Sequence, residues 1–188
     1  MKVYIDFDRT IFDCDRFEDD FYNLLENYGI SRDNFIKYQS QYKDFNPDVI
    51  LDTMSKEIDI NKDVYGAINN FIKKTSDYLF PDTIPFLKYL KNKNYQVIIL
   101  TKGNYDFQKN KIINSHIDSY YDDIIITSNH KGELDLDYNN SIFIDDREKE
   151  IESIKLKNPK RIIAIQRKGI IYKNVETVSS LSELINSI

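Results

Sequence analysis

Five short apolar segments, each rich in isoleucine or valine, constrain the fold of this chain more than any other feature of its sequence. They are residues 2–5, 96–100, 123–127, 141–144 and 161–165. Several are almost continuously apolar, whereas a strand with one wet face would alternate apolar and polar residues. They therefore predict strands that are buried on both faces, in a parallel sheet covered by helices.

Amphipathic segments lie between and after the later strands. Residues 82–92, 105–114 and 149–157 have apolar positions at helical spacing, and a last helix is expected from Ser180, with Glu183 at capping-box spacing. The alternation of strands and helices predicts an α/β fold, namely a Rossmann-like, doubly wound parallel sheet of about five strands.

One long stretch interrupts this alternation. Roughly 90 residues without a strand pattern separate the first and second strands, and they contain four apolar stripes at helical spacing. We expect residues 15–78 to form an inserted α-helical cap subdomain. Residues 1–14 and 79–188 would then form the α/β core.

Charge and composition exclude several classes of protein. The net charge is −5 and no basic cluster interrupts the mixture, so a surface for nucleic acid or for an anionic membrane has no support. No apolar run approaches the roughly 18 residues of a spanning helix. Because a strand is expected from the second residue onward, we expect no signal peptide and a cytoplasmic protein.

The single cysteine, Cys14, excludes an internal disulfide and fits a reducing compartment. Its acidic neighbours Asp13 and Asp15 should raise the pKa of the thiol and oppose formation of a thiolate. We therefore expect Cys14 to be a small packing residue.

Two pairs of aspartates lie where predicted strands end. Asp6 and Asp8 follow the first strand, and Asp145 and Asp146 end the fourth. Ligands of open α/β sheets bind outside the carboxyl ends of the strands. Carboxylates gathered there repel one another, which favours a bound cation or a shared proton.

Two further polar groups are expected at the same edge of the sheet. Thr101 directly follows the second strand, and Lys102 and Gly103 come next, before a predicted helix. A hydroxyl group with free backbone amides in front of a helix can bind an anion. Lys131 lies shortly after the third strand and would add a positive charge.

The order of these groups resembles that of the haloacid-dehalogenase superfamily of phosphohydrolases. The first motif of that family, Asp-x-Asp-x-Thr/Val after apolar residues, matches residues 6–10, and the second, a strand ending in Thr or Ser, matches Thr101. Lys131 best matches the third motif, and Asp145-Asp146 matches the fourth. The predicted helical insert also lies where this family carries a C1-type cap.

The resemblance implies an Mg²⁺-dependent phosphatase that acts on a small phosphorylated metabolite. Asp6 would attack phosphorus and form an aspartyl-phosphate, while Asp8 would protonate the leaving oxygen and then activate water. Thr101 and Lys131 would be catalytic through their hold on the phosphoryl oxygens. The phosphate-binding set would comprise Phe7, Asp8, Thr101, Lys102, Gly103 and Lys131.

A hard cation with oxygen ligands would relieve the repulsion between the aspartates, and Mg²⁺ is the usual partner of phosphates. The expected ligands are the Asp6 carboxylate, the backbone carbonyl of Asp8, and Asp146. Asp145 would bind the metal directly or through water. The sequence leaves the oligomeric state open.

Several positions have two interpretations. Arg9 stands where relatives often have glycine, and it is expected to be solvated rather than to reach the substrate. Asp13 could cap the first cap helix or support the site. Lys109 and Lys111 are weaker alternatives to Lys131 for the third motif. Both histidines are expected to stand aside, with substrate contact by His130 as the alternative.

Other functions use related residues. A haloacid dehalogenase needs neither a metal nor an acid two residues after the nucleophile, so Asp8 opposes it. A phosphomutase or another phosphotransferase would use the same residues as a phosphatase. A receiver module would need an aspartate after the third strand, where Thr127-Ser128-Asn129 stands. A non-catalytic binding protein is the remaining option, although each core motif residue is present.

Overall fold

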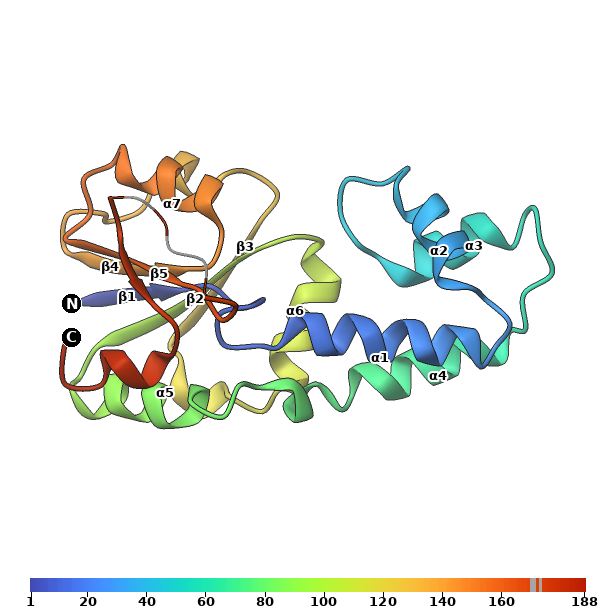
Figure 1. Ribbon diagram of the computed structural model, residues 1–188, viewed down its shortest axis with the longest axis horizontal. Helices are drawn as coiled ribbons and strands as arrows, with labels where there is room; N and C mark the ends of the chain where they lie inside the picture. Colours follow the sequence, from blue (N-terminus) through green and yellow to red (C-terminus); the bar gives the residue numbers. More distant parts are fainter. Residues whose placement is uncertain (170–171, 173) are drawn as a thin grey trace.

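The centre of the computed structural model, which describes residues 1–169, 172 and 174–188, is a six-stranded parallel sheet (Figure 1). The strand order is β3-β2-β1-β4-β5-β6. The strands are β1 (Lys2–Ile5), β2 (Gln96–Lys102), β3 (Asp123–Thr127), β4 (Ser141–Asp145), β5 (Arg161–Ile165) and β6 (Glu176–Val178). This arrangement confirms the predicted α/β class and the parallel sheet.

The sheet differs from the prediction in its sixth strand and in two boundaries. Strand β6 has three residues, of which only Val178 is buried, so it lacks the apolar run that identified the other strands. Strand β2 continues through Thr101 to Lys102, where the prediction ended it at residue 100. Strand β4 includes Asp145. Thr101 and Asp145 are therefore fixed by strand pairing instead of lying in loops.

Each face of the sheet packs against helices, as its apolar strands require. Tyr4, Ile98 and Phe143 point to one face, where Ile154 of α7 (Glu148–Lys155) joins their cluster. The neighbouring side chains of β1, β2 and β4 point to the other face and share a larger cluster with α5 (Thr83–Asn92) and α6 (Tyr105–Asn114). Figure 1 shows α7 and α5 on opposite sides of the strands.

The C-terminal segment departs from the prediction of a last helix. Only a single 3-10 turn, η4 (Leu181–Leu184), forms there. The capping box of Ser180 and Glu183 is present as expected. The turn does not propagate because Ile185 is extended and Asn186 has a φ of 72°.

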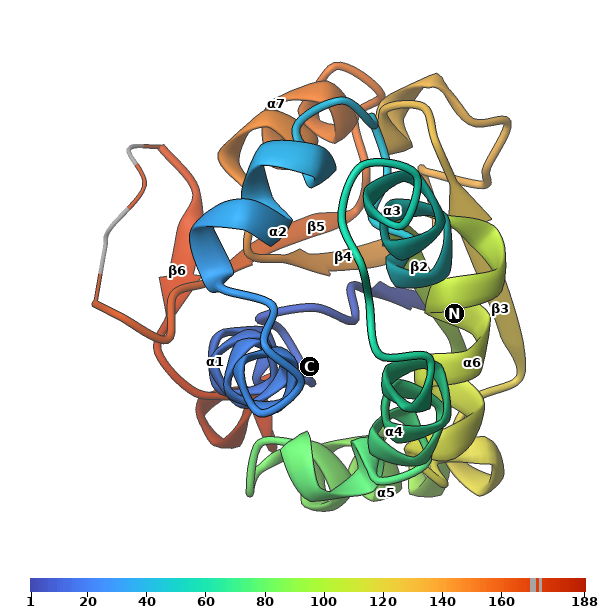
Figure 2. The same cartoon turned by 90° about the vertical axis from the view of Figure 1, so that its right-hand side faces the viewer.

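The segment between β1 and β2 contains helices that extend away from the sheet. They are α1 (Cys14–Glu26), α2 (Arg32–Gln39), α3 (Pro47–Met54), α4 (Asp63–Ile72) and the 3-10 turn η1 (Thr75–Tyr78). Helices α1 and α4 run side by side, and α2 and α3 pair beyond them (Figures 1 and 2). Four helices were expected here, while the division of the chain at residues 15 and 78 stays a prediction.

The chain leaves and re-enters the sheet region at one place. The amide of Asp13 donates to the Tyr78 carbonyl at 2.7 Å, and the amide of Phe80 donates to the Ile11 carbonyl at 3.1 Å. The hydroxyl of Thr83 also donates to the Ile11 carbonyl, at 2.7 Å. The outgoing and returning segments therefore hold each other beside the end of β1.

The insert shares its apolar interior with the sheet. Phe17 and Phe21 of α1 belong to the same buried cluster as the side chains of β1.

Across the described ranges, no helix is both long and apolar enough to cross a membrane.

Candidate active site

The strand order brings the predicted site residues to one edge of the sheet. Strand β1 lies between β2, which carries Thr101 near its end, and β4, which ends at Asp145. Asp6 directly follows β1, and its amide donates to the Ile144 carbonyl at 2.9 Å. A cavity of about 460 Å³ opens in front of this edge. Its lining includes Asp6, Asp8, Thr101, Lys102, Gly103, Lys131 and Asp146.

Lys131 bridges two of the aspartates. Its Nζ lies 2.6 Å from Asp6 Oδ1 and 2.5 Å from Asp145 Oδ2, and all three side chains are buried. Burial alone would lower the pKa of Lys131, but the charges of Asp145 and Asp6 outweigh it and raise the pKa. The lysine is therefore a fixed cation between two strand ends.

Burial also raises the pKa of Asp6 well above its usual range, against the attraction of Lys131 and with the repulsion of Asp145 and Asp146. Burial followed by the charge of Asp145 raises the pKa of Asp146 to about 7. One lysine therefore does not neutralise the excess negative charge of this cluster.

The cluster fits a divalent cation. Asp6, Asp145 and Asp146 each offer a carboxylate oxygen, and these atoms all lie within 4.8 Å of one another. Asp145 accepts from Lys131 Nζ and, at 2.9 Å, from the Arg147 amide. Within the described part of the chain, no hydrogen bond engages the Asp146 carboxylate, which is free to bind a metal. Hard oxygen donors of this kind suit Mg²⁺.

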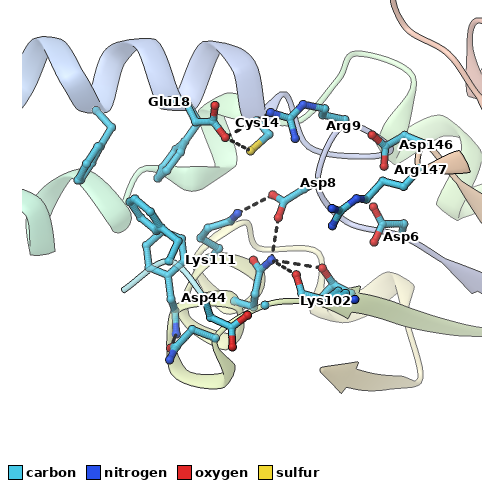
Figure 3. Close-up of a pocket in the computed structure, with 18 of the residues that line it drawn as sticks. Asp6, Asp8, Arg9, Cys14, Glu18, Asp44, Lys102, Lys111, Asp146 and Arg147 are labelled. Carbon is cyan, nitrogen blue, oxygen red and sulfur yellow. Dashed lines mark hydrogen bonds and ion pairs between the residues drawn. The ribbon is translucent and has the colours of Figure 1, made fainter. Parts of the chain in front are cut away.

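Asp8 lies in a different environment from Asp6. Its carboxylate accepts from Lys111 Nζ at 2.5 Å and from Gln108 Nε2 at 2.7 Å (Figure 3). Burial would raise the pKa of Asp8, but the charge of Lys111 and the hydrogen bond from Gln108 outweigh it and lower the pKa. The Asp8 side chain thus stands apart from the three-carboxylate cluster, and its carbonyl as a metal ligand stays a prediction.

Sequence reasoning missed the roles of Gln108 and Lys111. Lys111 was considered only as a weaker match to the third motif, yet it is 2% exposed and its ammonium lies 4.9–5.6 Å from four phenylalanine ring centroids. The available signal was their place on α6, because Gln108 and Lys111 share its buried side with Phe107 and Ile112. Polar residues on the buried side of a helix need partners there.

Lys131 is positioned by Glu150 of α7 and by Gly132, which packs against α7. Neither residue was identified from the sequence. The buried carboxylate of Glu150 accepts from the Lys131 amide at 2.8 Å and from Lys102 Nζ at 3.3 Å. Gly132 lies so close to α7 that an added Cβ would be 2.1 Å from the Ser153 carbonyl oxygen. Glycine is therefore required directly after the bridging lysine.

The predicted phosphate-binding loop after β2 needs a correction. The Gly103 amide donates to the Thr127 carbonyl at 3.0 Å, so the expectation of a free amide there is wrong. Asn104 caps α6 by accepting from the Phe107 amide at 3.0 Å. By contrast, no backbone carbonyl of the described residues accepts a hydrogen bond from the amide of Phe7 or Asp8. Both amides are therefore available to bind an anion.

The expectation of a solvated Arg9 is incomplete. Arg9 lines the cavity but pairs with Asp15 at 2.8 Å and Glu18 at 3.3 Å. Its φ is 58°, a left-handed conformation that glycine adopts without strain. Asp13, whose role was open, caps α1 by accepting from the Arg16 amide at 3.2 Å.

Of two further side chains, His130 lies outside the cavity as expected, whereas Cys14 lines it and its thiol donates to Glu18 at 3.2 Å. Cys14 is buried, and burial followed by the charge of Asp8 raises the pKa of its thiol. The direction agrees with the sequence argument, although Asp13 and Asp15 are not the cause. His130 contacts Glu150 at 3.0 Å and does not belong to the cavity lining.

Comparison with known proteins places these features in a family. The model of the family described as haloacid dehalogenase-like hydrolase matches residues 3–165. No curated protein matches the chain in sequence.

Solved structures share the fold over nearly the whole length of both chains. A HAD phosphatase from Thermococcus onnurineus is 20% identical, with a TM-score of 0.72 and coverage of 100% of this chain and 97% of that one. The HAD-hydrolase YfnB from Bacillus subtilis, bound to magnesium, is 14% identical, with a TM-score of 0.64 and coverage of 99% and 97%. The L-2-haloacid dehalogenase of Xanthobacter autotrophicus is 12% identical, with a TM-score of 0.66 and coverage of 98% and 96%. At these identities the likeness concerns the fold alone.

Proposed function

Because this chain belongs to the haloacid dehalogenase-like hydrolase family, we propose that it is an Mg²⁺-dependent phosphatase of small phosphomonoesters. The observation that carries the proposal is the pair of aspartates at the end of β1, which have different partners within one cavity. Asp6 pairs with Lys131, and Asp8 pairs with Lys111. Two carboxylates held in different surroundings can perform two different tasks. Mg²⁺ beside Asp6 would offset the burial that raises the pKa of its carboxyl and would so keep Asp6 ionised as the nucleophile.

In the first step a carboxylate oxygen of Asp6 attacks phosphorus. The Asp6 O–P bond forms, the bond from phosphorus to the leaving oxygen breaks, and Asp8 supplies the proton that the alcohol takes away. An incoming phosphate dianion raises the pKa of Asp8 and so promotes its protonation. Thr101, Lys131 and the amides of Phe7 and Asp8 stabilise the charge on the phosphoryl oxygens.

In the second step Asp8 takes a proton from water, the water oxygen attacks phosphorus, and Asp6 and inorganic phosphate are released. Having given up its proton in the first step, Asp8 is ionised beside Lys111, as a general base must be. Asp6, Asp145, Asp146 and the Asp8 carbonyl would hold Mg²⁺, which when bound neutralises their charge and that of the phosphoryl group. The proposal is supported by the carboxylate cluster and by the magnesium bound to the similar YfnB structure.

The test is turnover of p-nitrophenyl phosphate with and without Mg²⁺. Asp6→Asn should abolish turnover while leaving the urea unfolding curve close to that of the wild type. EDTA should stop the wild-type reaction, and added Mg²⁺ should restore it. A near-normal rate for Asp6→Asn would contradict the assignment of Asp6 as the nucleophile. Full activity in EDTA would contradict the requirement for a metal ion.

The same samples separate the related activities. A phosphatase releases inorganic phosphate, whereas a phosphomutase returns an isomer of a sugar phosphate without net release. A dehalogenase would release chloride from 2-chloropropionate in EDTA. We expect no chloride release, because Asp8 and the carboxylate cluster have no task in that reaction.

A further inference from the structure

The cavity has a second end, away from Asp6 and Asp8, that is lined by aromatic side chains. Phe45, from the connection between α2 and α3, meets Phe107 of α6 with ring centroids 4.8 Å apart and planes at 63°. Phe45 is only half-buried, so part of its ring faces the cavity. Further aromatic side chains of α1 complete this wall: Phe17, Phe21 and Tyr22.

Polar groups surround the same end. Asp44 is half-buried, and in the part of the chain that the structure describes its carboxylate forms no hydrogen bond or ion pair. Lys43, beside it, is exposed and also lines the cavity. Gln39 accepts from the Tyr22 hydroxyl at 3.3 Å, which leaves its amide NH₂ as a donor. The aromatic end therefore offers aromatic side chains together with both donors and acceptors.

Resting on the proposed phosphatase function, we propose that the substrate is a phosphomonoester whose alcohol carries a planar heteroaromatic ring, as a nucleoside monophosphate does. The phosphate would lie at Asp6, and the ring would contact Phe45 and Phe107. The donors and acceptors on the ring edge would face Asp44, Lys43 and Gln39. Aromatic side chains bind heteroaromatic bases through their π-faces, largely independently of base identity.

Phosphomonoesters of other alcohols would bind less favourably at the aromatic end of the cavity. A sugar phosphate would place hydroxyl groups against phenyl rings and lose their hydrogen bonds to water. An alkyl phosphate would bury the free carboxylate of Asp44 without a donor, which is also unfavourable. A heteroaromatic ring meets both requirements, because its faces are apolar and its edge is polar.

The volume of the cavity is compatible with such a substrate. At about 460 Å³ it falls within the roughly 300–1,000 Å³ of small-molecule sites. Asp6 and Phe45 both line this cavity, as simultaneous binding of the phosphate and the ring requires.

The test compares substrates that differ only in the ring. Adenosine and uridine 5′-monophosphates are each compared with ribose 5-phosphate, using inorganic phosphate release in Mg²⁺. We expect kcat/KM for at least one nucleotide to exceed that for ribose 5-phosphate by about 10-fold or more. Equal or lower values for both nucleotides would overturn the inference.

The outcome also separates this inference from the proposed function. If ribose 5-phosphate and p-nitrophenyl phosphate are hydrolysed but the nucleotides are not preferred, the phosphatase stands and the ring site fails. If none of these compounds is hydrolysed under any metal condition, both fail.

Variants locate the ring site. Phe45→Leu keeps an apolar side chain but removes the ring, and it should lower the ratio of nucleotide to ribose 5-phosphate kcat/KM by about 10-fold, chiefly through KM. Tyr42→Leu is the control, because Tyr42 lies in the same connection and does not line the cavity. Asp44→Asn, which removes no packing, should also lower the ratio. A ratio unchanged in both Phe45→Leu and Asp44→Asn would contradict the assignment.

Discussion

The ammonium group of Lys111 lies 2.5 Å from the carboxylate of Asp8. Two residues earlier, Asp6 is paired with Lys131, which comes from a different part of the chain. Neighbouring aspartates at the end of one strand thus have separate cations, one from α6 and one from the turn after β3. This division keeps the two carboxylates chemically distinct without any change in residue type.

Replacing Lys111 should affect both stability and turnover. Lys111→Met keeps the apolar stem among the phenylalanine rings but leaves the Asp8 carboxylate without its charged partner. Breaking a buried ion pair costs about 3 kcal/mol, so the free energy of unfolding should fall by that amount in urea. Turnover of p-nitrophenyl phosphate should fall as well, because Asp8 loses the contact that orients it.

The control for Lys111 is two residues away on the same helix. Lys109 is exposed; its ammonium donates to the Tyr105 hydroxyl at 3.4 Å and lies over the Tyr105 ring. Lys109→Met should change the free energy of unfolding by less than about 0.5 kcal/mol. Equal effects of the two substitutions would show that the pair with Asp8 has no special importance.

The buried carboxyl group of Glu150 makes the free energy of unfolding depend on pH. Burial would raise its pKa, but the hydrogen bonds from Lys131 and His130 outweigh it and lower the pKa in the folded state. A lowered folded pKa stabilises the fold above the unfolded pKa of about 4.3, and the stabilisation is lost as the pH falls through the folded value.

The test of that dependence is Glu150→Gln in urea at two pH values. At pH 7 the substitution should lower the free energy of unfolding by about 2 kcal/mol, since it weakens hydrogen bonds to a charged acceptor. Near pH 3 the difference from the wild type should shrink. A difference that grows on acidification would contradict the lowered pKa.

Gly132 should tolerate no side chain. In Gly132→Ala the new Cβ would meet the Ser153 carbonyl oxygen, so α7 and the turn must move apart and Lys131 must shift. We expect a loss of about 1–3 kcal/mol in the free energy of unfolding, together with reduced turnover. Gly66 in α4 is the control: apart from its chain neighbours and the backbone of its own helix, no described atom lies within 4 Å of its added Cβ. Gly66→Ala should therefore stabilise the fold by about 0.5–1 kcal/mol.

Arg9 allows the left-handed backbone to be tested separately from the side chain. Arg9→Ala and Arg9→Gly both remove the partly exposed pairs with Asp15 and Glu18. Only the glycine variant also relieves a φ of 58°. Thermal unfolding should therefore show Arg9→Gly to be more stable than Arg9→Ala by about 1 kcal/mol. Equal stabilities would mean that this turn holds little strain.

The sequence revealed those parts of the fold that depend on local pattern. The continuous apolar runs predicted five of the strands, because a strand buried on both faces must be apolar at every position. The positions of Asp6, Thr101 and Asp145 then followed from the rule that parallel strands end at one edge. Strand β6 was not predicted because it is short and lies at the edge of the sheet, where few of its residues are buried and no apolar run is required.

The partners of those residues could not be predicted in the same way. Lys111 is 103 residues from Asp8, and Lys131 is 125 residues from Asp6. Their pairing depends on how α6 and the turn after β3 pack, which no local pattern encodes. The Gly103 amide was misjudged for the same reason, because its acceptor is on another strand. Lys131 was identified from its place after the third strand and from the family motif, whereas Glu150 and Gly132, which position it, match no motif.

The hydrogen bonds that join Asp13 to Tyr78 and Phe80 to Ile11 have a consequence for engineering. An insertion whose ends meet at one point can be exchanged without changing the distance that the host chain must span. A few residues joining positions 13 and 78 could replace the helical segment and keep β1 in register with β2, if the core side chains that Phe17 and Phe21 cover were made polar as well. Helical segments from other hydrolases of this shape could be grafted at the same joint, which makes it a natural site for building chimaeras.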